Sequence, residues 1–191
     1  MEKRGRSIFI QHIGDSVPPL DIEEYRQILK KVGYGLDTHD TSGKARASLE
    51  EYMLLSIVFL EPYVLAELYS QIEGNVKWDA IKFVVRKLFS KLKGKKCNRI
   101  TSKTITEQPI TFGVKAIVDK NTKYDFSFTD LDPDKFDSTL DKMLEFLKEQ
   151  TPKQKIQPTQ FVRYDKKKGR WVEVNVLKEL REKHQKSKNK K

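Results

Sequence analysis

The sequence contains a single cysteine, Cys97, among 191 residues. One cysteine excludes an internal disulfide and leaves no cysteine cluster for zinc or an iron–sulfur centre. This usage is typical of a reducing compartment, and we expect a cytoplasmic protein. The first residues carry positive charge, but Gln11 and His12 interrupt the apolar residues that follow, so we expect no export signal.

Long hydrophobic runs are also lacking. The most apolar stretch, residues 52–60, is about half of the roughly 20 residues that a membrane span needs. Extending the stretch takes in Glu61, Pro62 and Glu67, which a span disfavours. We therefore expect 52–60 to lie in a buried core helix that starts near Ser48 and is kinked at Pro62. A true membrane span and a re-entrant or interfacial placement at a membrane are the alternatives.

Motifs for catalysis and nucleotide binding are missing as well. The sequence has no Ser-His-Asp order, no paired catalytic carboxylates, no dinucleotide glycine fingerprint and no metal-ligand spacing. We accordingly expect a non-catalytic protein without cofactor or metal. Histidine and carboxylates cluster locally only at Asp37, His39 and Asp40, in a predicted polar loop over 34–48, and an enzyme centred there is a further alternative.

Charge is abundant but unevenly distributed, with a net charge of +11. Residues 74–104 contain ten basic residues and one acidic residue, and residues 151–191 contain fourteen basic and four acidic residues. The other two parts of the chain, 1–73 and 105–150, are each net acidic by four charges. Such segregation indicates either a polyanionic partner or acidic and basic segments that face each other within the fold.

Hydrophobic periodicity and turn signals predict an α+β fold. In chain order we expect an N-terminal strand over 7–13, a helix over 21–32 capped by Asp21, the kinked buried helix and a basic amphipathic helix over 78–96. A ββα unit follows, with strands over 110–118 and 124–128 and a helix from Pro133. The chain ends in a basic hairpin and a basic tail. The aromatic side chains of the ββα unit are predicted to pack against its helix.

The predicted domain organisation follows composition. Residues 1–149 form an α+β globular domain, and residues 150–160, rich in proline and glutamine, form a linker. A basic hairpin over 161–175 either completes the sheet or stands apart as an arm. Residues 176–191 are a basic tail that begins as a helix and frays.

The helix predicted over 78–96 has two distinct sides. Seven apolar residues fall within one arc that faces a core: Trp78, Ile81, Val84, Val85, Leu88, Phe89 and Leu92. Lys82 and Arg86 lie at one edge of this arc, and Phe83 projects from the polar side. One interpretation is an ordinary amphipathic helix whose lysines keep it soluble; the other is a surface for phosphate groups or anionic lipid.

The leading hypothesis is a binding or adaptor module that engages a polyanion, most simply nucleic acid, through two basic blocks. A peripheral protein on an anionic membrane surface is the alternative. No small-molecule ligand is inferred. The predicted contact residues are Lys82, Phe83, Arg86, Lys87, Lys93, Lys95, Lys96 and Arg99 in the first block, and Lys166, Lys167, Lys168, Arg170 and Trp171 in the second.

Overall fold

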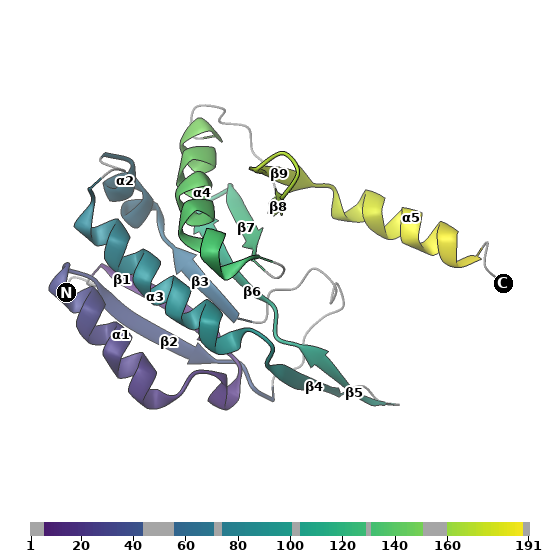
Figure 1. Ribbon diagram of the computed structural model, residues 1–191, viewed down its shortest axis with the longest axis horizontal. Coiled ribbons are helices and arrows are strands. Elements are labelled where there is room, and N and C mark those ends of the chain that lie inside the picture. Colours follow the sequence, from purple (N-terminus) through teal and green to yellow (C-terminus); the bar gives the residue numbers. More distant parts are fainter. Residues whose placement is uncertain are drawn as a thin grey trace.

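A mixed sheet with helices packed on one face forms the body of the protein (Figure 1). The computed structural model describes residues 6–43, 56–70, 74–100, 104–128, 131–150 and 160–188. The strands are β1 Ser7–His12, β2 Gly35–Asp40, β3 Ser56–Leu60, β4 Lys96–Ile100, β5 Ile105–Pro109, β6 Phe112–Ile117, β7 Lys123–Ser127, β8 Gln160–Asp165 and β9 Arg170–Val174. The helices are α1 Pro19–Lys31, α2 Pro62–Ser70, α3 Val76–Leu92, α4 Phe136–Gln150 and α5 Val176–Lys188.

The main sheet has seven strands in the order β2-β1-β3-β6-β7-β8-β9. Three neighbouring pairs are parallel, namely β1 with β2, β3 with β6 and β7 with β8, and the other three are antiparallel. Strands β4 and β5 form a separate antiparallel ribbon that projects from the body. Mixed pairing within one sheet confirms the predicted α+β class.

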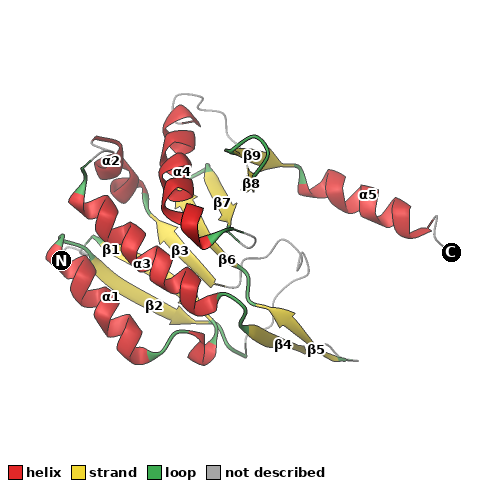
Figure 2. Cartoon of the chain, viewed as in Figure 1, coloured by secondary structure: helices red, strands yellow, loops and turns green. Residues whose placement is uncertain are grey.

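Helices α1, α3 and α4 lie on the same side of the sheet (Figure 2). Alternate strand residues face these helices and are buried, as Ile8 and Ile10 of β1 and Phe126 of β7 illustrate. Helix α4 completes the predicted ββα unit. Its buried side includes an apolar stripe at helical spacing: Phe136, Leu140, Met143, Leu144 and Leu147.

The prediction of a buried helix over 52–60 is wrong for the residues that the structure describes there. Ser56–Leu60 is the strand β3, hydrogen-bonded between β1 and β6, and four of its five residues are buried. A short apolar run buried on both faces has no periodicity that separates strand from helix. Pro62 does not kink a helix but begins α2, where its missing N–H costs nothing. Residues 44–55, with the predicted start at Ser48, lie outside the described residues.

Two smaller corrections concern the first 40 residues. The predicted polar loop contains the edge strand β2, Gly35–Asp40, which pairs with β1 over its whole length. Helix α1 begins at Pro19 rather than after Asp21, so that Asp21 lies in the first turn, where its negative charge suits the helix dipole.

The basic helix and the C-terminal part follow the prediction more closely. Helix α3 is capped by Asn75, whose side chain accepts hydrogen bonds from the N–H groups of Lys77 (3.0 Å) and Trp78 (3.3 Å). It ends at Leu92, before the predicted end at 96. The C-terminal hairpin is β8 and β9, and β8 pairs with β7, so the hairpin extends the main sheet.

Helix α5 projects from the end of β9 away from the body (Figure 1). It continues to Lys188, further than the fraying tail that the sequence predicts. Residues 151–159 of the predicted linker and residues 189–191 lie outside the described residues. None of the helices in the described ranges combines the length and the apolar character that a membrane crossing requires.

Candidate polyanion-binding surface

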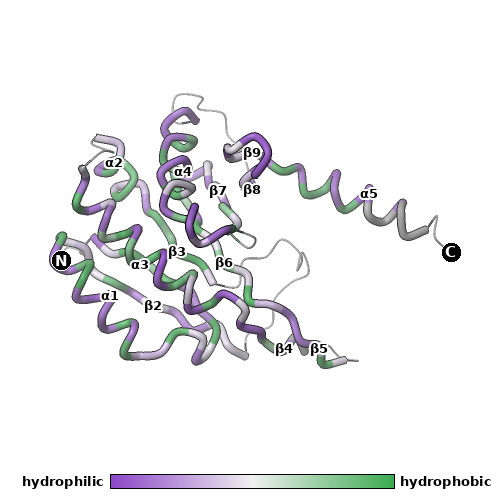
Figure 3. Tube along the Cα trace, viewed as in Figure 1, coloured by the Kyte–Doolittle hydropathy of each residue, from purple (hydrophilic) through white to green (hydrophobic). Residues whose placement is uncertain are grey.

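Helix α3 buries the whole apolar arc predicted from the sequence. All seven residues are buried: Trp78, Ile81, Val84, Val85, Leu88, Phe89 and Leu92. Figure 3 shows the resulting alternation of hydrophobic and hydrophilic positions along this helix. The interpretation of α3 as a core helix is therefore confirmed, and its basic edge decides whether it also contributes a binding surface.

The basic edge of α3 faces carboxylates of α4. Lys82 Nζ lies 3.1 Å from Asp141 Oδ1 and 3.2 Å from Asp79 Oδ1, and only 19% of its side chain is exposed. Arg86 pairs with Asp137 at 2.6 Å. Burial alone would lower the pKa of Lys82, but its hydrogen bonds to Asp141 and Asp79 outweigh burial and raise the pKa. These cations are held within the fold by the acidic segment 105–150.

Asp141 also accepts a hydrogen bond from Trp78 Nε1 at 2.7 Å. One carboxylate thus joins the buried indole of α3 to the ammonium of Lys82, and removing Lys82 from this network to contact a phosphate would leave Asp141 without its cation. Charge pairs of this kind, partly buried and doubly hydrogen-bonded, are poor sources of free positive charge.

Phe83 and Lys87 lie together on the polar side of α3. Lys87 Nζ is 5.4 Å from the centre of the Phe83 ring, and the guanidinium carbon of Arg86 is 5.8 Å from it. These distances are typical of cation–π contacts. Phe83 is half-buried, and its ring makes cation–π contacts with Arg86 and Lys87 of its own helix.

The remaining residues of the first block follow α3 in the chain. Lys95 Nζ donates to the carbonyl of Ser16 at 2.9 Å, and Lys96 pairs with Glu107 at 2.6 Å across the β4–β5 ribbon. Lys93 is exposed at the end of α3. Arg99 belongs to β4, and its side chain lies outside what the structure describes.

The second block is displayed on the turn between β8 and β9. Asp165 accepts hydrogen bonds from the N–H groups of Lys168 (3.1 Å) and Lys167 (2.9 Å), and these bonds lower the pKa of its carboxyl. Gly169 completes the turn with a φ of 62°. The turn backbone is thereby fixed while the side chains of Lys166, Lys167 and Lys168 are exposed.

Lys142 of α4 joins this turn, although the sequence did not single it out. Its Nζ donates to the carbonyl of Gly169 at 2.9 Å and to Tyr164 Oη at 3.2 Å. We name Lys142, Lys166, Lys167, Lys168 and Arg170 the hairpin cation cluster. In the described part of the chain, one of the five has a carboxylate partner: Lys168 lies 3.8 Å from Asp165.

Trp171 is not available as a contact residue. Its side chain is 4% exposed, it packs edge-on against Phe126 and Phe128, and its Nε1 donates to the carbonyl of Thr139 at 3.0 Å. The prediction that its ring meets a ligand is corrected for a physical reason: β9 adds to the sheet, and alternation along β9 turns Trp171 toward α4.

Among the described residues, the basic edge of α3 and the basic turn of the hairpin do not merge into one surface. In Figure 1, α4 lies between α3 and the β8–β9 hairpin, with Asp137 and Asp141 directed to α3 and Lys142 directed to the hairpin. Lys82 and Arg86 of the first block are thus paired with carboxylates on one side of α4, and the turn of the hairpin contacts Lys142 on the other side.

The histidine and carboxylates of β2 do not converge. His39 and Asp37 alternate with Asp40 along the strand, so Asp40 faces the opposite side of the sheet. Asp40 accepts hydrogen bonds from the N–H groups of Ser42 (2.8 Å) and Gly14 (2.7 Å), which lower the pKa of its carboxyl. Across the described ranges, no group of three or more metal-binding side chains is placed to hold an ion.

Comparisons of the chain with protein-family models, with curated proteins and with solved structures found no match.

Proposed function

We propose that the protein is a non-catalytic binding module that engages a polyanion, with nucleic acid as the expected partner, through the hairpin cation cluster and helix α5. The observation that carries this proposal is the concentration of five cations at one turn with a single carboxylate partner among the described residues. Unpaired surface cations release counterions when they meet phosphates, and this release drives binding to nucleic acid.

Helix α5 extends the positive surface beyond the hairpin. Its sequence holds five basic and two acidic residues, and Glu179 is engaged by Arg163 of β8 at 3.2 Å. In Figure 3 the hairpin turn is hydrophilic, and the first turns of α5 alternate hydrophobic and hydrophilic positions. A projecting basic helix beside a basic turn supports contact with an extended polymer rather than with a small ion.

The first block contributes less to this proposal than the sequence suggests. Lys82, Arg86 and Lys96 each have a carboxylate partner, so a phosphate would have to compete with an existing ion pair. Lys87 of α3 and Lys93 just after it are exposed, but α4 separates them from the hairpin cation cluster. We therefore expect most of the binding energy to come from the C-terminal part.

Fluorescence anisotropy with a labelled duplex and a labelled single strand tests the proposal over a salt series. Each neutralised phosphate contributes roughly 0.9 to the slope of log K against log salt on duplex DNA, so five cations give up to about 4.5. The triple variant Lys166→Ala, Lys167→Ala, Lys168→Ala should lower this slope by about 2.7. A matched triple variant of the first block, Lys87→Ala, Lys93→Ala and Lys96→Ala, should change it by less than 1.

Three results would contradict the proposal. Binding that is undetectable at low salt, a slope that stays flat across the series, or equal losses in the two triple variants would each remove the hairpin as the contact site. Flotation with anionic liposomes distinguishes the membrane alternative, since a lipid-surface protein should float with the vesicles and bind oligonucleotides weakly.

A further inference from the structure

Strand β9 is an edge of the seven-stranded sheet. It pairs with β8 on one side, and no other described strand pairs with it. Alternate residues of an antiparallel strand direct their N–H and C=O groups to opposite sides, so part of the β9 backbone points outward without a partner strand. Such an edge is a template for a further strand unless side chains or another element cover it.

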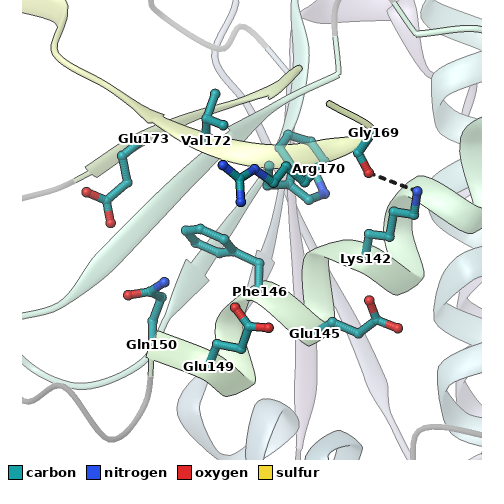
Figure 4. A pocket seen from close by; sticks show the side chains of 10 residues that line it. Lys142, Glu145, Phe146, Glu149, Gln150, Gly169, Arg170, Val172 and Glu173 are labelled. Carbon is teal, nitrogen blue, oxygen red and sulfur yellow. Dashed lines mark hydrogen bonds between the residues drawn. The ribbon is translucent and has the colours of Figure 1, made fainter. Parts of the chain in front are cut away.

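A groove of about 480 Å³ runs between this edge and the C-terminal half of α4 (Figure 4). Its lining comes from residues 142–150 of α4 and 169–173 around β9. The volume lies within the range of roughly 300–1,000 Å³ that ligand pockets occupy. Helix and edge strand are thus spaced apart by a hollow rather than packed against each other along their whole length.

The length of the groove suits an extended chain. Residues 142–150 of α4 rise by about 12 Å at 1.5 Å per residue, and four residues of an added strand span about 13 Å. Phe146 stands in the middle of the groove in Figure 4. Its ring is held edge-on by Tyr124 and Phe126, with centroids 5.7 Å away in both cases, so it offers a fixed apolar contact.

The charges of the groove favour a cationic occupant. Glu145 and Glu149 line it from α4 and Glu173 lines it from β9, and no ion pair of these carboxylates occurs within the described residues. Of its cations, Lys142 is engaged by the carbonyl of Gly169. Arg170 is the other. Two glutamates one helical turn apart and one across the groove provide partners for alternate side chains of a strand.

We propose that this groove binds an extended peptide segment with lysine or arginine side chains, which adds to β9 as an eighth strand of the sheet. Main-chain hydrogen bonds to β9 would supply the affinity, and the carboxylates and Phe146 would select alternate cationic and apolar side chains. The proposal does not rest on polyanion binding, because the carboxylates of the groove repel phosphate and the turn lysines Lys166, Lys167 and Lys168 do not line it.

The test uses the full chain and two labelled octapeptides of alternating lysine and valine, one of them N-methylated at every backbone amide. Methylation keeps the charge and removes every backbone N–H donor, so the unmodified peptide should bind at least about tenfold more tightly. Amide shifts on binding should concentrate at residues 170–174. Binding of the two peptides with equal affinity, or no binding of the unmodified peptide below about 1 mM, would overturn the proposal.

A pair of charge reversals tests the carboxylates. The variant Glu145→Lys, Glu149→Lys should weaken the unmodified peptide by at least about tenfold, because both side chains are exposed and their replacement leaves the core intact. The matched variant Asp15→Lys, Glu24→Lys makes the same change of net charge at exposed positions of the N-terminal part and should change affinity less than about twofold. Equal losses in the two variants would show that only net charge matters and would refute the groove as the site.

Discussion

Replacing Trp171 by alanine tests whether the C-terminal hairpin is an integral part of the fold. The indole is 4% exposed, its ring centroid lies 4.9 Å from that of Phe126 and 5.0 Å from that of Phe128, and it donates to the carbonyl of Thr139. These contacts join β9 to β7 and α4. We predict that Trp171→Ala destabilises the core and the hairpin together.

The size of the effect follows from burial. Removing a buried tryptophan side chain of about 200 Å² forfeits about 5 kcal/mol at roughly 25 cal/mol per Å², and measured truncations of buried aromatics cost about 3–5 kcal/mol. Trp171→Phe keeps an aromatic ring and loses the indole N–H bond, for which we expect about 1–2 kcal/mol. Both changes are large beside a typical domain stability of roughly 5–15 kcal/mol.

Urea denaturation followed by tryptophan fluorescence is the direct assay. The chain has two tryptophans, so Trp78 is the only one left in either variant, and it lies buried in α3. If hairpin and core unfold as one unit, the midpoint reported by Trp78 should fall by the full amount. An unchanged Trp78 midpoint in Trp171→Ala would refute the conclusion that the hairpin and the core unfold together. A loss of polyanion affinity in Trp171→Phe with unchanged stability would refute the conclusion that Trp171 is a core residue and not a contact residue.

Two further predictions concern a helix cap and a carboxyl pKa. Asn75→Ala removes the acceptor for the N–H groups of Lys77 and Trp78 and should cost about 1 kcal/mol in thermal unfolding, whereas Asn75→Asp should cost less; equal losses would contradict this. Burial raises the pKa of Asp125 above its ordinary 3.8, against the opposing effect of Lys115, so the native state binds this proton more tightly than the unfolded chain. The stability of wild type relative to Asp125→Asn should therefore fall as pH rises from about 3.8 upward in paired urea titrations, and a rising difference would disprove the assignment.

The fold class and most helices could be predicted because their signals are local. The apolar arc of α3 and the apolar stripe of α4 repeat with the helical period. The helix predicted from Pro133 begins with the turn Pro133–Lys135, which Asp132 caps by accepting a hydrogen bond from the N–H of Asp134. The alternation in Phe112–Ile117 and Lys123–Ser127 likewise predicted the hairpin that forms. Where one face of an element is buried and the other is exposed, the period of its hydrophobic residues predicts whether it is a helix or a strand.

The misassigned segments are those whose structure depends on distant partners. Ile57 and Val58 are buried on opposite faces of β3, and only the neighbouring strands β1 and β6 make that segment a central strand. Gly35–Asp40 is mostly exposed and polar, and it becomes a strand because β1 pairs with it. The residue pattern of each segment does not indicate which distant strand it pairs with.

Prediction of the candidate binding surface had the same limit, because its contacts also depend on segments that are distant in the sequence. Lys82 and Arg86 are four residues apart on α3, and Asp137 and Asp141 are four apart on α4, so each pair lies on one side of its helix. The sequence shows the four-residue spacing of the two cations and of the two carboxylates. It does not show that the basic side of α3 packs against the acidic side of α4, because other carboxylates in the chain have the same spacing. Lys142 escaped notice for the same reason: only the packing of the hairpin brings it to Gly169.

The position of α4 determines where the net charge of +11 can act. Its carboxylates pair with Lys82 and Arg86 of α3 at close range, whereas the turn lysines Lys166, Lys167 and Lys168 are exposed on the opposite side. At physiological ionic strength charges are screened beyond about 8 Å, so a distant basic block adds little to binding at the hairpin. A polyanion should therefore respond to the local density of unpaired cations rather than to the basicity of the chain as a whole. Moving three lysines from the hairpin turn to the exposed surface of α1 would preserve net charge and should still abolish most of the affinity.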